Sequence, residues 1–494
     1  MTITSKAKSD GVLVVLLALL IAGCAVGPNY RRPPAPTVSG YTADAVTNTA
    51  AITNIAGGEG QRFVPGADLS AQWWTLFHSQ ALNDLVARAL KANPNIKAAQ
   101  ASLLAARESV RSQRGAYYPS VDASFAASRN KSPEQLSSVP NQQIFYYSLF
   151  TPEVAVSYTP DVFGLNRRTV ESLNAQAQQQ RFSLIATYIT LSANVVSAAV
   201  NEAALRGQIA ATRQLVDQNN KALDVLRAQF AKGYASRLDL AAQESQVAQI
   251  AATLPPLLKQ LAQQRDALAV LVGAFPSEDP AEKFELANLH LPEDLPLSLP
   301  AKLVEQRPDI RQAEENMHAA SAQVGISIAN RIPNITLSAN AGSTALAIDQ
   351  LFSSGTGFWS LGAAVSQPIF QGGMLLHKER AAKAAYVEAS EQYRAVVLAA
   401  FQNVADTLNA LEQDGNALKA AVEAEHAAKV TFDLTQKQLQ SGYINYLTLV
   451  SAETVYQQAV MALVQAQANR YADTAALFLA LGGGWWNQGD LSKN

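Results

Sequence analysis

The sequence predicts an α+β membrane protein in which two copies of one unit each supply two strands to a β-barrel and one very long α-helix. Three observations predict this class: a leader that ends at the sole cysteine, an internal duplication, and two very long helical segments without proline. The 494 residues carry a net charge of -2 and are 48% hydrophobic. Such a chain can bury a large core, and its charge gives no attraction toward nucleic acid.

The chain begins with a predicted signal peptide, residues 1–23. Two lysines precede an apolar run at residues 12–21, which is shorter than the roughly 20 residues that span a bilayer. The run ends in Ile-Ala-Gly-Cys, similar to a bacterial lipobox, with the cysteine at Cys24. A lone cysteine can form no internal disulfide, so we predict that Cys24 is acylated; the alternative is an incidental cysteine in an ordinary secretory signal. Ala25 stands where an aspartate favours inner-membrane retention in similar lipoproteins, which favours the outer membrane.

Residues 24–70 are rich in Pro, Gly, Thr and Ala and show no periodicity. This composition predicts a lipidated, extended tether. After Ile21 we identify no segment with the length and apolarity of a transmembrane helix. Because helices and closed barrels are the structures that span membranes, we expect any membrane-spanning part to be a β-barrel.

A tandem duplication accounts for most of the remaining chain, with repeats at residues 71–285 and 286–484 and a tail at 485–494. Landmarks recur in the same order in both repeats, and internal similarity of this kind predicts two copies of one structural unit. The matched pairs are Asn93-Pro94-Asn95-Ile96 with Arg307-Pro308-Asp309-Ile310, Pro119 with Pro333, Pro160 with Pro368, Gly164 with Gly372, Lys232–Leu240 with Ser441–Leu449, Glu244 with Glu453, and Gly273 with Gly482.

Each repeat is predicted to contain a helix, two strands, a long helix, a turn and a return helix. The first helices, 82–115 and 301–330, carry Ala and Leu at helical spacing. The strands show period-2 alternation of apolar residues. In the outgoing strands these are Val121, Ala123, Phe125 and Ala127, and Ile335, Leu337, Ala339 and Ala341; in the return strands they are Val154, Val156 and Tyr158, and Leu361, Ala363 and Val365.

The long helices are predicted at residues 166–231 and 374–440, each roughly 100 Å long at the usual rise per residue. Periodic helices of this length are typical of coiled-coil or tubular packing. Each meets a Gly-Tyr turn and a return helix, which we expect to be broken in the first repeat at Pro255-Pro256. Residues 482–484, three consecutive glycines, are expected to stop the last helix.

Four strands cannot close a barrel, because the smallest membrane barrels need about eight. Unpaired strand edges in hydrocarbon leave backbone groups without partners, so several chains are expected to share one barrel.

At this point the sequence resembles the outer membrane factor family, the TolC-like lipoprotein channels of efflux systems, of the NodT type. The residues that carry the resemblance are Cys24 with Pro28 and Tyr30, Trp73-Trp74 to Phe77, Arg307-Pro308-Asp309-Ile310, both Gly-Tyr turns, and Ala480-Leu481-Gly482-Gly483-Gly484-Trp485. The resemblance implies a homotrimer with a shared twelve-stranded β-barrel, four strands per chain, continued by a helical periplasmic tunnel.

The resemblance also implies the function, an outer-membrane exit duct of a tripartite efflux pump for drugs or other small toxic compounds. A periplasmic adaptor protein and an inner-membrane pump, of the RND type, are the expected partners, together with outer-membrane lipid. The alternative is the exit duct of a type I protein secretion system. An outer-membrane barrel enzyme does not need two helices of this length, and a coiled-coil surface lipoprotein does not need two alternating hairpins at equivalent positions.

Site residues follow from the same resemblance. In related pumps the adaptor docks at the two turns, which implies contacts at Gly233, Tyr234, Ala235, Ser236, Gly442 and Tyr443. The alternative is that the glycines cap the long helices, and both roles can coexist.

The tunnel of TolC-like channels narrows just after the second turn. The matching positions here are Leu447, Thr448, Ser451 and Thr454, with Asp239 on the first-repeat helix. Relatives place charged residues among these sites, whereas three of these four are neutral and polar, so an ionic lock is in doubt. A ring of Leu447 side chains can instead exclude water from a pore; the alternative is that Leu447 packs between helices.

The sequence does not suggest catalysis. Nucleotide-binding motifs are absent, and the three glycines at 482–484 lack a following lysine. We therefore expect no enzymatic activity, no metal and no cofactor other than the lipid on Cys24. The five histidines lack the close spacing of a metal or catalytic pair: His78, His290, His318, His377 and His426.

Overall fold

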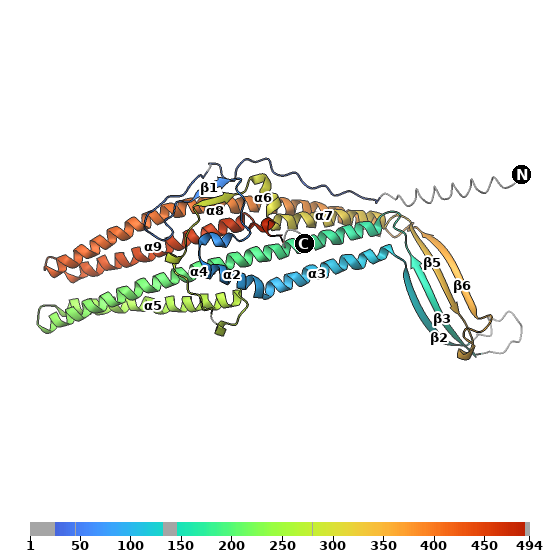
Figure 1. Ribbon diagram of the computed structural model, residues 1–494, viewed down its shortest axis with the longest axis horizontal. Helices are drawn as coiled ribbons and strands as arrows, with labels where there is room; N and C mark the ends of the chain where they lie inside the picture. Colours follow the sequence, from blue (N-terminus) through green and yellow to red (C-terminus); the bar gives the residue numbers. More distant parts are fainter. Residues whose placement is uncertain (1–24, 45, 132–145, 279, 490–494) are drawn as a thin grey trace. The chain divides into compact units, whose positions relative to one another are not determined.

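The computed structural model describes residues 25–44, 46–131, 146–278 and 280–489 (Figure 1). Cys24 and the predicted signal peptide lie outside the described residues, as does the end of the C-terminal tail. The described chain divides into two compact units. The first contains the residues up to Arg32, Leu103–Gln180 and Ala313–Tyr393; the second contains Pro33–Ser102, Arg181–Gln312 and the residues from Arg394 onward.

The first unit contains a four-stranded antiparallel sheet in the order β2-β3-β5-β6. Each repeat supplies two adjacent strands, which confirms the predicted hairpins, and β3 pairs with β5 to join the repeats. The strands are β2 (Ser120–Lys131), β3 (Tyr146–Tyr158), β5 (Asn334–Ser343) and β6 (Gly357–Ser366).

The two faces of this sheet differ in chemistry, as the alternation predicts. The register aligns Ala123, Val154, Ala341 and Trp359 across the four strands, and cross-strand partners share a face. The neighbouring row carries the polar residues of the other face: Asp122, Asn340 and Ser360, with Ala155. Large side chains of the apolar face are exposed, including Val121, Phe125, Leu361 and Val365.

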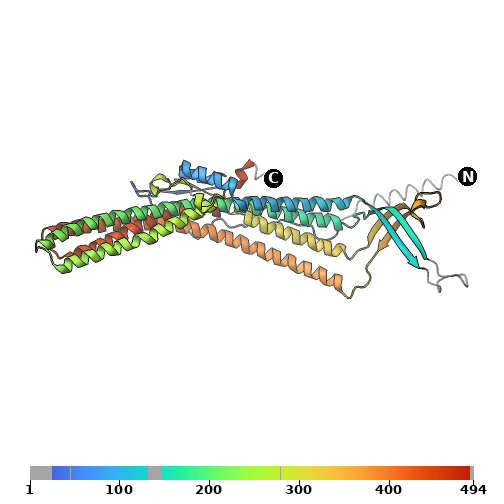
Figure 2. The same cartoon turned by 90° about the horizontal axis from the view of Figure 1, so that it is seen from below.

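The long helices have the predicted extent. Helix α4 spans Leu165–Ala231 and α8 spans Met374–Gln440, with 67 residues in each. In the second unit, return helix α5 (Arg237–Leu271) lies along α4, and α9 (Tyr446–Ala480) lies along α8 (Figures 1 and 2). An 18-residue window of α4 has a mean hydropathy of 1.5, so the expectation that no later segment matches a membrane span is wrong by this measure; 61% of that window is buried, which is typical of a core helix.

The predicted opening helices are each split in two, because a residue before proline is pushed out of the helical region. Helix α2 (Gln80–Ala92) and α3 (Pro94–Arg114) are separated by Asn93. In the second repeat α6 (Pro300–Gln306) and α7 (Pro308–Ala329) are separated by Arg307. The guanidinium of Arg307 donates to the carbonyl oxygen of Ala480 at 2.9 Å, and so caps the end of α9.

The break predicted at Pro255-Pro256 is wrong, since α5 runs through both prolines. A proline removes one helical hydrogen bond and leaves the carbonyl four residues earlier without its partner. Both prolines lie on the exposed side of α5, where water can satisfy those carbonyls. The three glycines at 482–484 all have positive φ and follow α9, which confirms the predicted helix stop.

The segment expected to be a free tether is packed in part against the second unit. Strand β1 (Arg62–Pro65) pairs in parallel with β4 (Asp294–Leu297). Arg470 of α9 is fully buried, and its guanidinium donates to the carbonyl oxygens of Gly57 and Glu59 at 2.6 and 2.9 Å. Composition alone did not predict this packing, because the partners lie more than 400 residues away in sequence.

Short helices complete both units. In the second unit, Trp73 packs on Phe478 with ring centroids 5.3 Å apart. In the first unit, η2 (Gly115–Tyr117) precedes β2 and η6 (Ile348–Gln350) lies between β5 and β6. The short helices of the second unit are η1 (Trp73–Phe77), η4 (Pro276–Glu278), η5 (Leu286–Asn288) and η7 (Trp485–Asn487).

Candidate functional site

The two Gly-Tyr turns lie in the second unit and have the same construction. In the first, the N–H of Gly233 donates to Phe230 O and the N–H of Tyr234 donates to Gln229 O, both at 2.9 Å. This is the Schellman pattern, which needs a residue with positive φ at the glycine position, and Gly233 has φ of 79°. The second turn repeats it with Gly442 at φ of 75°. The capping role of both glycines is therefore present.

The return helices begin with side-chain caps at equivalent positions. Ser236 Oγ accepts from the N–H of Asp239 at 3.1 Å, and the Asp239 carboxylate accepts from the N–H of Ser236 at 3.1 Å, which completes a capping box. In the second repeat Asn445 Oδ1 accepts from the N–H of Thr448 at 3.1 Å. Asp239, a predicted gate residue, thus forms part of the N-terminal cap of α5.

The tyrosines of the turns are strongly exposed, Tyr234 by 81% and Tyr443 by 84%. Ala235 behaves differently, because it packs against the buried cluster of Leu226, Tyr446 and Leu449. A bulky group at Ala235 therefore disturbs the hairpin itself as well as any partner. The two tyrosines are the better candidates for a contact surface at this end.

A cavity of about 770 Å³ lies between the hairpins just inside the turns. Residues from both repeats line it, among them Tyr234, Ala235 and Asp239 from the first and Gly442 and Tyr446 from the second. The structure thus brings together the first-repeat and second-repeat residues that the sequence placed at the turns.

The predicted gate residues occupy the first turns of α9. Leu447 is 54% exposed, so it does not pack between helices of the described chain. Thr448 and Ser451 are also exposed, whereas Thr454 is half-buried and its hydroxyl donates to Val450 O at 2.9 Å. A gate at these positions stays a prediction.

The structure also contains a buried polar cluster near the turns, which the sequence did not predict. Asn219 of α4, Gln243 of α5 and Glu453 of α9 are at most 3% exposed. The amide nitrogen of Gln243 donates to Asn219 Oδ1 at 3.0 Å, and the amide nitrogen of Asn219 donates to the Glu453 carboxyl. The cluster therefore ties three helices from both repeats together.

Burial raises the pKa of Glu453 to about 7, and the hydrogen bond from Asn219 opposes this shift. The matching residue of the first repeat, Glu244, is 39% exposed at its side chain and lies 3.9 Å from Arg227. The repeat alignment had matched the two glutamates, and that match was the available signal. It gave no indication that one of them is buried.

Two of the five histidines lie near each other in the structure. The rings of His78 and His290 lie 6.4 Å apart between centroids, a pair that sequence spacing did not suggest. Among the residues that the structure describes, no group of three or more His, Cys, Asp or Glu is arranged to hold a metal ion.

Known proteins of one family match this chain over nearly its whole length. The family model described as outer membrane efflux protein matches residues 85–274 and 299–483. The chain is 29% identical over 498 aligned residues to the toluene efflux pump outer membrane protein TtgF of Pseudomonas putida, covering 96% of this chain and 97% of the relative. It is 28% identical to the outer membrane protein OprJ of Pseudomonas aeruginosa, with 96% of each chain covered.

A solved structure of the outer-membrane channel OprN is similar in fold as well as sequence. The TM-score is 0.83 at 25% identity, and the match covers 94% of this chain and 100% of that chain. The similarity therefore includes both units and both repeats.

Proposed function

Because the chain belongs to the outer membrane efflux protein family and is thus an outer-membrane component of an efflux pump, we propose that it is the passive, trimeric exit duct of a tripartite pump. The substrates proposed are drugs or other small toxic compounds. The name of TtgF refers to toluene efflux, which favours small compounds over the alternative of secreted proteins.

The four-stranded sheet is the observation that carries this proposal. Its apolar row suits lipid and its polar row suits a water-filled lumen, as in outer-membrane barrels. Within the described residues, β2 and β6 each have a strand on one side only. Three copies of four strands give a closed barrel of twelve, in which β2 of one chain pairs with β6 of the next, and closure satisfies the edge groups that hydrocarbon cannot.

The proposed partners are a periplasmic adaptor that docks at the two turns and an inner-membrane pump of the RND type. The exposed tyrosines of both turns support the first partner. The absence of a nucleotide-binding motif from the sequence supports an external energy source. We propose accordingly that the chain catalyses no reaction and holds no cofactor apart from its lipid.

Lipid anchoring at Cys24 is part of the proposal and rests on the lipobox-like sequence. It adds a second attachment to the outer membrane beside the barrel.

Export in whole cells tests the function. A strain that lacks its own outer-membrane component but retains adaptor and pump is expected to recover resistance to a small toxic compound when this chain is supplied. Omitting the adaptor or pump should abolish the recovery. Recovery that persists without either partner would contradict a passive duct.

A further inference from the structure

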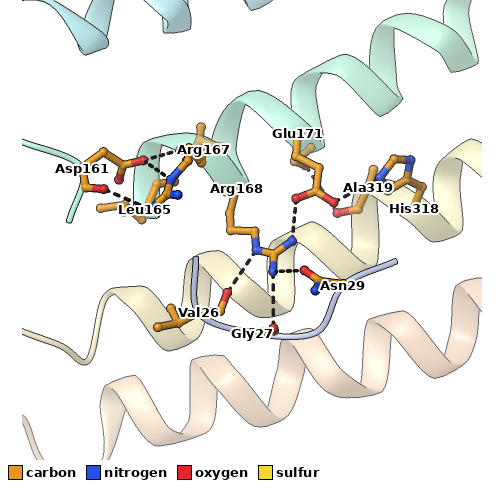
Figure 3. Close-up of polar contacts among 12 residues, drawn as sticks. Val26, Gly27, Asn29, Asp161, Leu165, Arg167, Arg168, Glu171, His318 and Ala319 are labelled. Carbon is orange, nitrogen blue, oxygen red and sulfur yellow. Dashed lines mark hydrogen bonds and ion pairs between the residues drawn. The ribbon is translucent and has the colours of Figure 1, made fainter. Parts of the chain in front are cut away.

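The first described residues of the chain are held against α4 and α7 by one buried arginine (Figure 3). Arg168 is 4% exposed, and its guanidinium points at the loop formed by residues 26–29. Its Nε donates to Val26 O at 3.0 Å, and Nη2 donates to Gly27 O at 3.3 Å and to Asn29 Oδ1 at 2.8 Å. Nη1 donates to Glu171 Oε2 at 2.7 Å. Three of these acceptors come from the N-terminal segment.

Glycines on both sides allow the segment to approach this closely. A Cβ on Gly27, which has φ of 92°, would lie 2.5 Å from the Cα of Gly325 in α7. A Cβ on Gly164 would lie 2.6 Å from the Cα of Ala25. The N–H of Val26 also donates to Phe163 O at 3.1 Å. The N-terminal segment therefore packs backbone against backbone at two places, and a side chain on either glycine would prevent this packing.

Side chains of α7 hold the following residues. The ring of Tyr30 stacks on His318 with centroids 4.3 Å apart and an interplanar angle of 16°. His318 Nε2 lies 3.2 Å from Glu171 Oε1, so Glu171 contacts both His318 and Arg168. Arg32 forms an ion pair with Glu314 at 3.2 Å.

The duplication shows that each of the two key residues occurs in one repeat only, Arg168 in the first repeat and Gly325 in the second. Arg168 lies eight residues after Pro160, and the position eight residues after the matching Pro368 is Leu376. Gly325 lies seventeen residues after Pro308, and the position seventeen residues after Pro94 is Arg111. The second repeat thus keeps its long helix without the arginine, and the first repeat keeps its opening helix without the glycine. Neither residue is required by the repeat architecture itself.

We propose that Arg168 and Gly325 form a docking site for residues 25–32, and that this site fixes where the N-terminal segment leaves the folded protein. The exit point is beside Gly164, between the end of β3 and the start of α4. Where Cys24 is acylated, as in the proposed function, the lipid emerges at this end of the sheet. Docking of the peptide segment does not depend on the lipid. Arg168 is a positioning residue that acts through the backbone of Val26 and Gly27.

Trypsin cleavage after Arg31 measures the docking on the purified full-length protein in detergent. Arg31 is exposed, and the next bond, Arg32–Pro33, resists trypsin because of the proline. In Arg168→Leu the buried carbonyls lose a charged donor, so we expect the cleavage rate to rise roughly tenfold or more. Gly27→Ala should raise the cleavage rate to a similar extent, because its methyl group clashes with Gly325 and displaces the N-terminal segment. This substitution lies in the segment, so helices α4 and α7 are unchanged.

Arg167→Leu is the matched control. Arg167 is adjacent in α4 but pairs with Asp161 at 3.3 Å instead of the N-terminal segment, so its cleavage rate should equal that of the wild type. If Arg168→Leu does not fold, Gly27→Ala decides alone. Wild-type cleavage rates in Gly27→Ala, or an equal rise in Arg167→Leu, would overturn the docking site.

A Cys24→Ala chain secreted behind an ordinary signal separates docking from lipidation. Slow cleavage in this chain is expected, since the contacts of Arg168 remain. Fast cleavage would show that the lipid holds the segment and would overturn the proposal. A wild-type protein without lipid but with slow cleavage would contradict the lipid anchor alone and leave the docking site standing.

Discussion

The amide of Asn219 in α4 donates a hydrogen bond to the carboxyl group of Glu453 in α9, which joins a helix of the first repeat to a helix of the second. Both residues are almost completely buried. A buried carboxyl group favours its neutral form, because the protein interior solvates charge poorly. Glu453 therefore couples the contact between the hairpins to protonation.

Stability is expected to fall as pH rises through the titration range of Glu453. Its pKa is about 7 in the folded chain, against an ordinary value of 4.5 for this carboxyl group, so the folded state binds more protons between these limits. The contribution of Glu453 is therefore most favourable below pH 4.5, is lost as pH rises to 7, and is constant above; the total loss is roughly 3 kcal/mol.

Glu453→Gln should remove this dependence, because glutamine can still accept from Asn219 without carrying charge. The measurement is the Tm from circular dichroism at pH 5 and pH 8, and the variant should be the more stable protein at pH 8. Glu244→Gln is the control from the equivalent, more exposed position, and should keep the wild-type difference in Tm. A Glu453→Gln chain with that same difference would refute the assignment.

The exposed turn tyrosines are expected to bind the adaptor. Replacing Tyr234 and Tyr443 together by alanine should weaken adaptor binding by roughly tenfold or more, as for aromatic residues at the centre of an interface. Both side chains are over 80% exposed, so the fold should persist. Tyr118→Ala, which removes a 74% exposed tyrosine of the first unit, should leave affinity unchanged. Equal affinities for all three proteins would count against docking at the turns.

A leucine gate predicts a specific conductance change. Leu447→Ala or Leu447→Ser should give a larger and more persistent pore in a planar bilayer, because a wider and wetter constriction no longer excludes water. Leu434→Ala removes an exposed leucine of α8 (53%) and should conduct as the wild type does. Closed channels in both Leu447 variants would show that the constriction lies elsewhere.

Lipidation predicts a defined N-terminus. Mass spectrometry of the N-terminal peptide from membranes should find Cys24 as the first residue and bearing acyl chains. A free thiol at Cys24, or cleavage at another bond, would remove the lipid anchor and leave the barrel unaffected.

Periodicity and duplication were sufficient to predict the strands and long helices. The alternation at Val121 to Ala127 and the proline-free run before Gly233 can each be recognised within a short window of sequence. Such periodicity indicates a strand or a helix without knowledge of distant contacts. Prolines misled in both directions. Pro94 and Pro308 follow helix breaks, whereas Pro255 and Pro256 lie on the exposed side of an unbroken helix, where water can satisfy the freed carbonyls.

The buried polar residues could not be predicted from the sequence. Arg168, Asn219 and Arg470 lie in helices rich in polar residues, where most such side chains face water. Each of the three has a partner in a segment at least 139 residues distant. Burial at these positions is a property of the tertiary contacts and leaves no local pattern.

The mass of the assembled protein tests the central claim most directly. Native mass spectrometry of the protein extracted from outer membranes should give three times the mass of one processed chain, because three four-stranded sheets are needed to close the barrel. A monomeric mass under conditions that preserve other outer-membrane barrels would contradict the shared barrel, and with it the proposed exit duct.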